Sequence, residues 1–115
     1  MKHIKTTSRE KFDLLHQSRS AQAAMMNLRP GSTSDEALSN EHPGSEQWLF
    51  VLSGSGEALV GKPRSSVRRT KISEGSLLLI EKGELHQIRN VGRKMLKTLN
   101  FYMPPAYDAQ GNPKS

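Results

Sequence analysis

Histidine is the residue type in this sequence with the broadest chemistry, and His86 has the most informative surroundings. It follows an apolar run, Leu77 to Ile80, and a break at Lys82-Gly83-Glu84, and it begins a segment of alternating character. Period-2 geometry puts His86, Ile88 and Asn90 on one face of a strand, so His86 points inward together with Ile88. Such a histidine is either a core residue with one hydrogen bond or a metal ligand, and a ligand needs partners elsewhere in the chain.

The segment around His86 resembles the second of the two sequence motifs of the cupin family, G-x5-P-x-G-x2-H-x3-N. Gly75, Gly83, His86 and Asn90 all fall in register with it. Glu81 occupies the position where the family usually has proline, which loosens the turn and leaves the spacing of the histidine unchanged.

The first motif of that family, G-x5-H-x-H-x3 or 4-E-x6-G, aligns with this sequence when it is anchored at His42 and Gly54. Counting from either anchor places Gln47 at the glutamate position. The first histidine position falls on Asn40 and the opening glycine position on Ser34. Two of the five fixed positions match, while asparagine and glutamine keep oxygen donors at the usual ligand places.

Similarity to cupins implies a double-stranded β-helix, that is, a jelly-roll barrel, with a metal held at its centre by both motifs. The ligands implied here are Asn40, His42, Gln47 and His86, and the metal is one divalent ion: zinc, iron, manganese or nickel. Four neutral donors leave the dication uncompensated, so solvent, hydroxide or an anionic or oxygen-rich substrate should complete its coordination. The alternative is an empty barrel whose two histidines pair with their neighbours.

Charge compensation by a nearby carboxylate is a further possibility, although strand alternation opposes it. Glu46 adjoins Gln47 and Glu41 adjoins His42, so each side chain should face away from its neighbour unless the strand is bulged. The candidates for an acid or base beside the metal are Glu46, Glu41 and Tyr102, and no catalytic residue is assigned. The sequence therefore leaves open a metal-dependent enzyme, of oxygenase, isomerase or lyase type, and a non-catalytic small-ligand binder.

The rest of the chain predicts an all-β domain of about eight short strands with no convincing helix. Residues 47–61 and 75–91 are each predicted to form a hairpin, and the loop 31–46 is longer than a compact domain usually contains. The predicted strands span residues 12–17, 20–28, 47–53, 57–61, 66–72, 77–80, 86–91 and 95–103. Residues 1–11 form an arm or an edge strand, and residues 106–115 form a loose tail.

The strand from Gln47 is predicted to turn Leu49 and Val51 to the same face as Gln47. Trp48, Phe50 and Leu52 then lie on the opposite face. Three large apolar side chains on an outer face predict a two-fold homodimer or a cover supplied by the N-terminal arm.

Length and composition give the remaining expectations, on domain number, localisation and nucleic-acid binding. The 115 residues suit a single domain, no cysteine is present, and the formal charge is +6. The N-terminus has no apolar leader and no segment is long enough to span a membrane, which predicts a cytoplasmic protein. A basic group lacks the interleaved aromatic residues of a nucleic-acid groove, so it predicts a solvated face; its members are Lys62, Arg64, Arg68, Arg69, Lys71, Arg93, Lys94 and Lys97.

Overall fold

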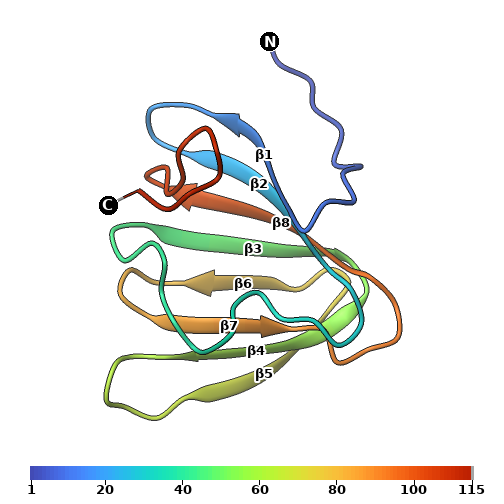
Figure 1. Ribbon diagram of the computed structural model, residues 1–115, viewed down its shortest axis with the longest axis vertical. Helices are drawn as coiled ribbons and strands as arrows, with labels where there is room; N and C mark the ends of the chain where they lie inside the picture. Colours follow the sequence, from blue (N-terminus) through green and yellow to red (C-terminus); the bar gives the residue numbers. More distant parts are fainter. Residues whose placement is uncertain (115) are drawn as a thin grey trace.

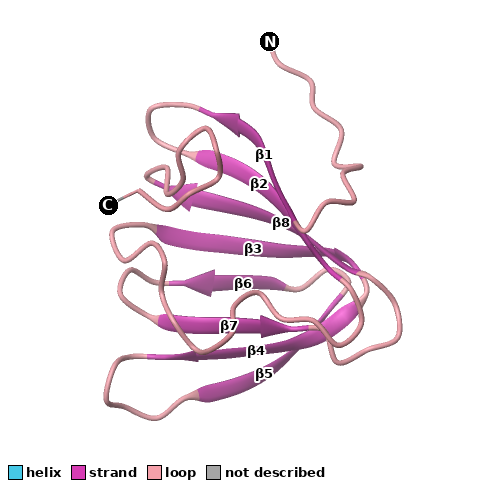
Figure 2. Cartoon of the chain, in the orientation of Figure 1, coloured by secondary structure: helices cyan, strands magenta, loops and turns pink. Residues whose placement is uncertain are grey.

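The computed structural model describes residues 1–114, and this part of the chain contains strands and loops but no helix (Figures 1 and 2). The all-β class and the number of strands agree with the prediction. The strands are β1 (Phe12–Gln17), β2 (Gln22–Leu28), β3 (Glu46–Ser53), β4 (Ser55–Gly61), β5 (Arg68–Ser73), β6 (Leu77–Ile80), β7 (Leu85–Arg89) and β8 (Leu96–Met103). No helix among these residues is long and apolar enough to cross a membrane.

The strands form two antiparallel sheets. The larger has the order β1-β2-β8-β3-β6 and the smaller the order β5-β4-β7. Their facing sides enclose an apolar cluster that includes Leu28, Leu49, Val51, Ile88 and Leu96, all at most 1% exposed. These residues come from four strands, so burial of their side chains holds the two sheets together, at roughly 25 cal/mol for each Å² of apolar surface removed from water.

Alternation along β3 follows the prediction. Gln47, Leu49 and Val51 are buried, whereas Trp48 is 41% exposed and Phe50 is half-buried. The prediction of opposite faces is therefore confirmed, because the pleat of a strand sends successive side chains to opposite sides.

The predicted hairpin over residues 47–61 is wrong. β3 pairs with β6 and β8 in one sheet, whereas β4 pairs with β5 and β7 in the other. Gly54 alone separates the two strands, and its φ of 87° lets the chain pass from one sheet to the other instead of folding back. A Cβ at Gly54 would also collide with the carbonyl oxygen of Met95, so this crossing requires glycine.

The predicted hairpin over residues 75–91 is also wrong. β6 lies at the edge of the larger sheet, with Ile80 opposite Gln47, and β7 lies at the edge of the smaller sheet, with His86 opposite Val60. The intervening turn, in which Gly83 has a φ of 82°, carries the chain between sheets. Sequence alternation identified both strands correctly, but it holds no information on which strand each one pairs with.

The long loop between β2 and β3 runs along the free edge of β7 (Figure 1). Ser39 and His86 exchange backbone hydrogen bonds of 3.2 and 2.8 Å, and the Ser34 amide donates to the Ile88 carbonyl at 2.8 Å. These bonds satisfy backbone groups that would otherwise be unpaired at a sheet edge. They also bring the residues of the first motif next to His86.

The two end segments of the chain differ in how they are held. Residues 1–9 form no strand, which favours the arm over the edge strand among the two predicted alternatives. The expectation of a loose tail does not hold for its first residues, because Ala106 and Tyr107 are 3% and 7% exposed. Their backbone amides both donate to Oε1 of the buried Gln22 at 3.1 Å, which holds this part of the tail against β2.

Candidate functional site

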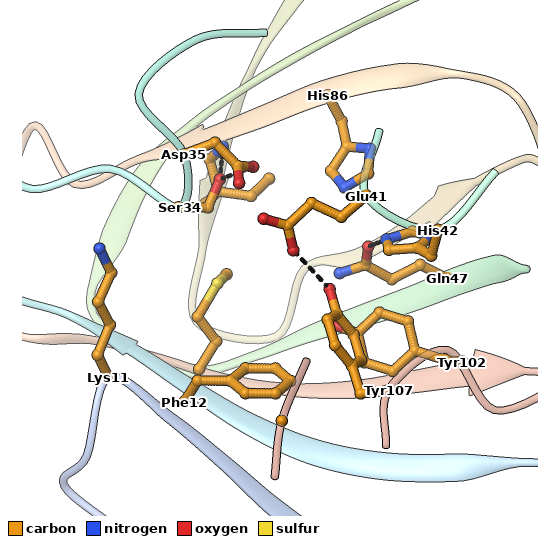
Figure 3. Close-up of a pocket in the computed structure, with 13 residues that line it drawn as sticks. Lys11, Phe12, Ser34, Asp35, Glu41, His42, Gln47, His86, Tyr102 and Tyr107 are labelled. Carbon is orange, nitrogen blue, oxygen red and sulfur yellow. Dashed lines mark hydrogen bonds between the residues drawn. The ribbon is translucent and has the colours of Figure 1, made fainter. Parts of the chain in front are cut away.

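A cavity of about 250 Å³ lies between the two sheets (Figure 3). Strands of both sheets contribute to its walls, together with the long loop, Lys11 from the arm and Tyr107 from the tail. Its lining residues are Lys11, Phe12, Met26, Ser34, Asp35, Glu41, His42, Gln47, His86, Ile88, Tyr102, Tyr107 and Gly111.

Three of the four residues predicted as metal ligands line this cavity. The ring centroids of His42 and His86 are 5.0 Å apart, and His42 Nε2 is 3.0 Å from Gln47 Oε1 (Figure 3). Asn40 has a different role, since its Oδ1 accepts a hydrogen bond of 2.8 Å from the backbone amide of His42. Asn40 thus shapes the turn that presents His42, as asparagine commonly does two residues before a backbone donor.

A chain of buried hydrogen bonds determines the proton position on His42. The Met26 carbonyl can only accept, so Thr98 Oγ1 donates to it at 2.8 Å, and Asn100 Nδ2 donates to Thr98 Oγ1 at 2.9 Å. Gln47 Nε2 then donates to Asn100 Oδ1 at 2.8 Å, which leaves Gln47 Oε1 to accept from His42 Nε2. A neutral His42 therefore carries its proton on Nε2, and its Nδ1 is a buried lone pair with no partner among residues 1–114.

His86 is held in the complementary way. Its Nδ1 donates to the backbone carbonyl of Glu84 at 3.3 Å, which leaves Nε2 as the unprotonated nitrogen. Burial is the main cause, and repulsion from His42 the second, of a pKa of His86 that is lowered to about 4. His86 is therefore neutral at neutral pH, and Figure 3 shows its ring directed across the cavity toward Glu41.

Two carboxyl groups complete the polar part of the cavity. Burial and the charge of neighbouring Glu41 raise the pKa of Asp35 to about 6. Glu41 Oε2 accepts a hydrogen bond of 3.2 Å from the Tyr107 hydroxyl. Burial also raises the pKa of Tyr107 and of Tyr102, so both phenols stay protonated.

Sequence reasoning located some of these residues and missed others. Glu41 and Tyr102 were nominated and do line the cavity, whereas Glu46 lies outside the lining, on β3 opposite Met103. Asp35 and Tyr107 were missed. Asp35 belongs to a loop without periodicity, and Tyr107 follows Pro104-Pro105, where the pattern suggested an unstructured tail; neither position carries a local signal of its neighbours in space.

Hydrogen bonds within the protein engage donor atoms of three of the four predicted metal ligands. The proton on His42 Nε2 points at Gln47 Oε1, and the oxygen of Asn40 is bound to a backbone amide. No three histidine, aspartate or glutamate side chains among residues 1–114 are grouped as metal ligands would be. The metal centre at Asn40, His42, Gln47 and His86 therefore stays a prediction.

The fold has many relatives among solved structures. The Bacillus halodurans protein BH2720 is 23% identical, with a TM-score of 0.81 over 94% of this chain and 78% of that one. Thermus thermophilus TT1209 is 20% identical, with a TM-score of 0.68 over 81% of each chain. An oxalate decarboxylase of Lactobacillus farciminis, solved as a formate complex, is 26% identical with a TM-score of 0.69; the match covers 78% of this chain and only 26% of that enzyme.

Among curated proteins, no sequence is significantly similar to this chain. The family model of the cupin domain matches residues 24–102. This range contains both motifs, all or most of seven of the eight strands, and most of the residues that line the cavity. The chain belongs to the cupin family.

Proposed function

We propose that this protein is a small-molecule-binding cupin, with the predicted jelly-roll barrel formed by its two sheets and the ligand held in the cavity between them. A volume of about 250 Å³ equals the space of about eight water molecules. The ligand is therefore a small compound.

The observation that carries this proposal is the unfilled hydrogen-bonding capacity of two buried side chains. His42 and His86 are 4% and 6% exposed, and each presents one nitrogen without a partner among the described residues. Leaving a buried polar group unpaired costs about 1–3 kcal/mol, which structures rarely tolerate without a ligand or water to satisfy the group.

The four histidines provide a direct test. His42 and His86 line the cavity, whereas His3 and His16 are exposed on the arm and on β1. We expect a ligand from a panel of small cations, neutral polar compounds and carboxylates to shift the imidazole ¹H–¹³C signals of the first pair and leave those of the second unchanged. A panel in which every compound shifts all four signals equally, or shifts none, would contradict the proposal.

Metal binding, and with it a metal-dependent enzyme, is the second candidate. It is favoured by the 5.0 Å approach of the His42 and His86 rings, which come from different motifs and different elements. Its test is elemental analysis of protein purified without an affinity tag. About one equivalent of metal, lost in His86→Ala and kept in His16→Ala, would support it; metal content that is the same in both variants would exclude His86 as a ligand.

For partners, we propose a homodimer through the outer face of the larger sheet. Trp48 lies opposite Leu79 on β6 and Phe101 on β8, and Leu77 is adjacent to Leu79 along the same edge strand. These four side chains are 36–57% exposed. Large apolar side chains clustered on one sheet face are typical of an interface between proteins.

A further inference from the structure

We propose that the cavity selects a small organic ammonium ion that carries N–H donors on a short aromatic or apolar body. This inference rests on the proposed function and names the class of ligand. It departs from the anionic or oxygen-rich ligand that the neutral metal site and the basic composition suggested.

Hydrogen-bond donors in the cavity wall are largely used within the protein. His42 Nε2 donates to Gln47, Gln47 Nε2 donates to Asn100, and His86 Nδ1 donates to a backbone carbonyl. The Tyr107 hydroxyl donates to Glu41.

Apart from the Lys11 ammonium and the Tyr102 hydroxyl, the polar groups that remain in the lining are acceptors. His86 Nε2 is a lone pair on a side chain more than nine-tenths buried, and Figure 3 shows His86 directed into the cavity. The carboxylates of Asp35 and Glu41 have further acceptor sites, because an ionised carboxylate accepts at about four positions. A ligand that complements this wall must be rich in donors.

The charge balance of the wall points to the same ligand. Asp35 and Glu41 are acidic, and Lys11 is the single lysine or arginine in the lining. Figure 3 shows the two carboxylates near the middle of the cavity and the Lys11 side chain at its margin. The eight residues of the basic group lie outside the lining, so the charge of +6 describes the outer surface and not the cavity.

Aromatic rings form the wall facing these carboxylates. The Phe12 and Tyr107 centroids are 4.8 Å apart, and the Tyr102 and Tyr107 centroids are 5.1 Å apart at 75°. Aromatic rings beside an acidic group attract organic cations through the negative electrostatic potential of the ring face. They also cover the apolar part of the ligand.

The test uses three probes of nearly equal shape: benzylammonium, benzyl alcohol and benzoate. Affinity is measured by calorimetry at neutral pH, and the imidazole signals of His42 and His86 report whether the probe enters the cavity. We expect benzylammonium to bind at least about tenfold more tightly than benzyl alcohol, since charge-assisted hydrogen bonds are about twice as strong as neutral ones, and benzoate to bind most weakly.

Three variants address the named groups. Glu41→Gln and Asp35→Asn should each weaken the binding of benzylammonium about fivefold and leave that of benzyl alcohol unchanged. The expected effect is modest because Asp35 is only partly buried and Glu41 is exposed, so solvent screens both charges. Lys11→Met should increase the affinity for benzylammonium. Glu74→Gln, in the exposed turn between β5 and β6, is the matched control and should change nothing.

The outcomes separate this inference from the proposed function. Benzyl alcohol or benzoate binding in the cavity as tightly as benzylammonium would overturn the ammonium preference and leave a small-molecule site intact. Benzylammonium binding that survives both carboxylate variants would also overturn it. Failure of all three probes to shift His42 and His86 would count against both the ammonium preference and the proposed site.

Discussion

Stability as a function of pH provides a sharp test of the environment of His86. The pKa of His86 is lowered from 6.5 to about 4 in the folded protein. The unfolded chain therefore binds more protons between these values, and the stability is fully present above pH 6.5 and is lost as the pH falls toward 4. The difference corresponds to about 3 kcal/mol, at about 1.4 kcal/mol for each tenfold step.

Asp35 opposes this effect in an overlapping range. Its pKa is raised from 3.8 to about 6, so the folded protein binds more protons there and its contribution to stability falls as the pH rises toward 6. The two effects partly cancel in the wild-type protein. Asp35→Asn removes the opposing group and should reveal the full dependence on His86.

The assay is urea unfolding of Asp35→Asn and of Asp35→Asn/His86→Gln at several pH values between about 4 and 7, with EDTA present to exclude adventitious metal. On acidification, we expect the free energy of unfolding of the single variant to fall by about 3 kcal/mol more than that of the double variant. Asp35→Asn/His16→Gln, which removes an exposed histidine, should behave like the single variant. Parallel pH profiles for the first two proteins would refute the assignment of a buried, neutral His86.

Three further changes test other parts of the structure. Gly54→Ala should destabilise the fold by about 2 kcal/mol or more, measured by urea unfolding, because the φ of 87° and the Met95 carbonyl both oppose a Cβ; Gly44→Ala, with open space around it, is the control. Trp48→Lys should convert the proposed homodimer to a monomer in analytical ultracentrifugation, and an unchanged molar mass, or a monomeric wild type, would contradict the interface. Gln47→Glu should lower stability by about 1–3 kcal/mol without metal, because an ionised carboxylate cannot donate to Asn100 Oδ1; equal stability of the two proteins would count against the direction of the hydrogen-bond chain.

Local sequence patterns predicted the strands well because alternation and turn residues act within a few positions. The buried faces of β3 and β7 followed from period-2 geometry, and the approach of His42 to His86 followed from the family motifs. Pairing between strands was predicted wrongly at both supposed hairpins. A glycine turn has similar sequence requirements whether the chain folds back on itself or crosses to the other sheet, and the choice depends on where the apolar faces of distant strands can be buried.

The composition of the cavity was harder to predict than its location. Asp35, Tyr107 and Lys11 come from a loop, a tail and an arm, and none of them carries a periodic signal. Their convergence depends on long-range contacts such as those of Gln22 with the tail and of Asn27, whose amide donates to the Ser8 and Glu10 carbonyls of the arm at 2.9 and 2.7 Å. The net charge of the whole chain is a poor guide to the charge of the cavity for the same reason, since it counts residues without regard to which of them face the site.

Gln47 shows how a departure from the family motif is matched by its surroundings. An ionised glutamate at this position could accept from His42 but could not donate to Asn100 Oδ1. Asn100 would then have to rotate its amide, Thr98 would have to donate to Asn100, and the Met26 carbonyl would lose its hydrogen bond from the Thr98 hydroxyl. Glutamine both donates and accepts. The donor-to-acceptor direction set at the Met26 carbonyl therefore continues through Gln47 to His42, and Nδ1 of that ring is left as a lone pair. The change from a carboxylate to an amide thus removes a charged donor for a metal and, together with Asn100 and Thr98, selects the tautomer of a neutral His42 in which Nδ1 can accept a hydrogen bond.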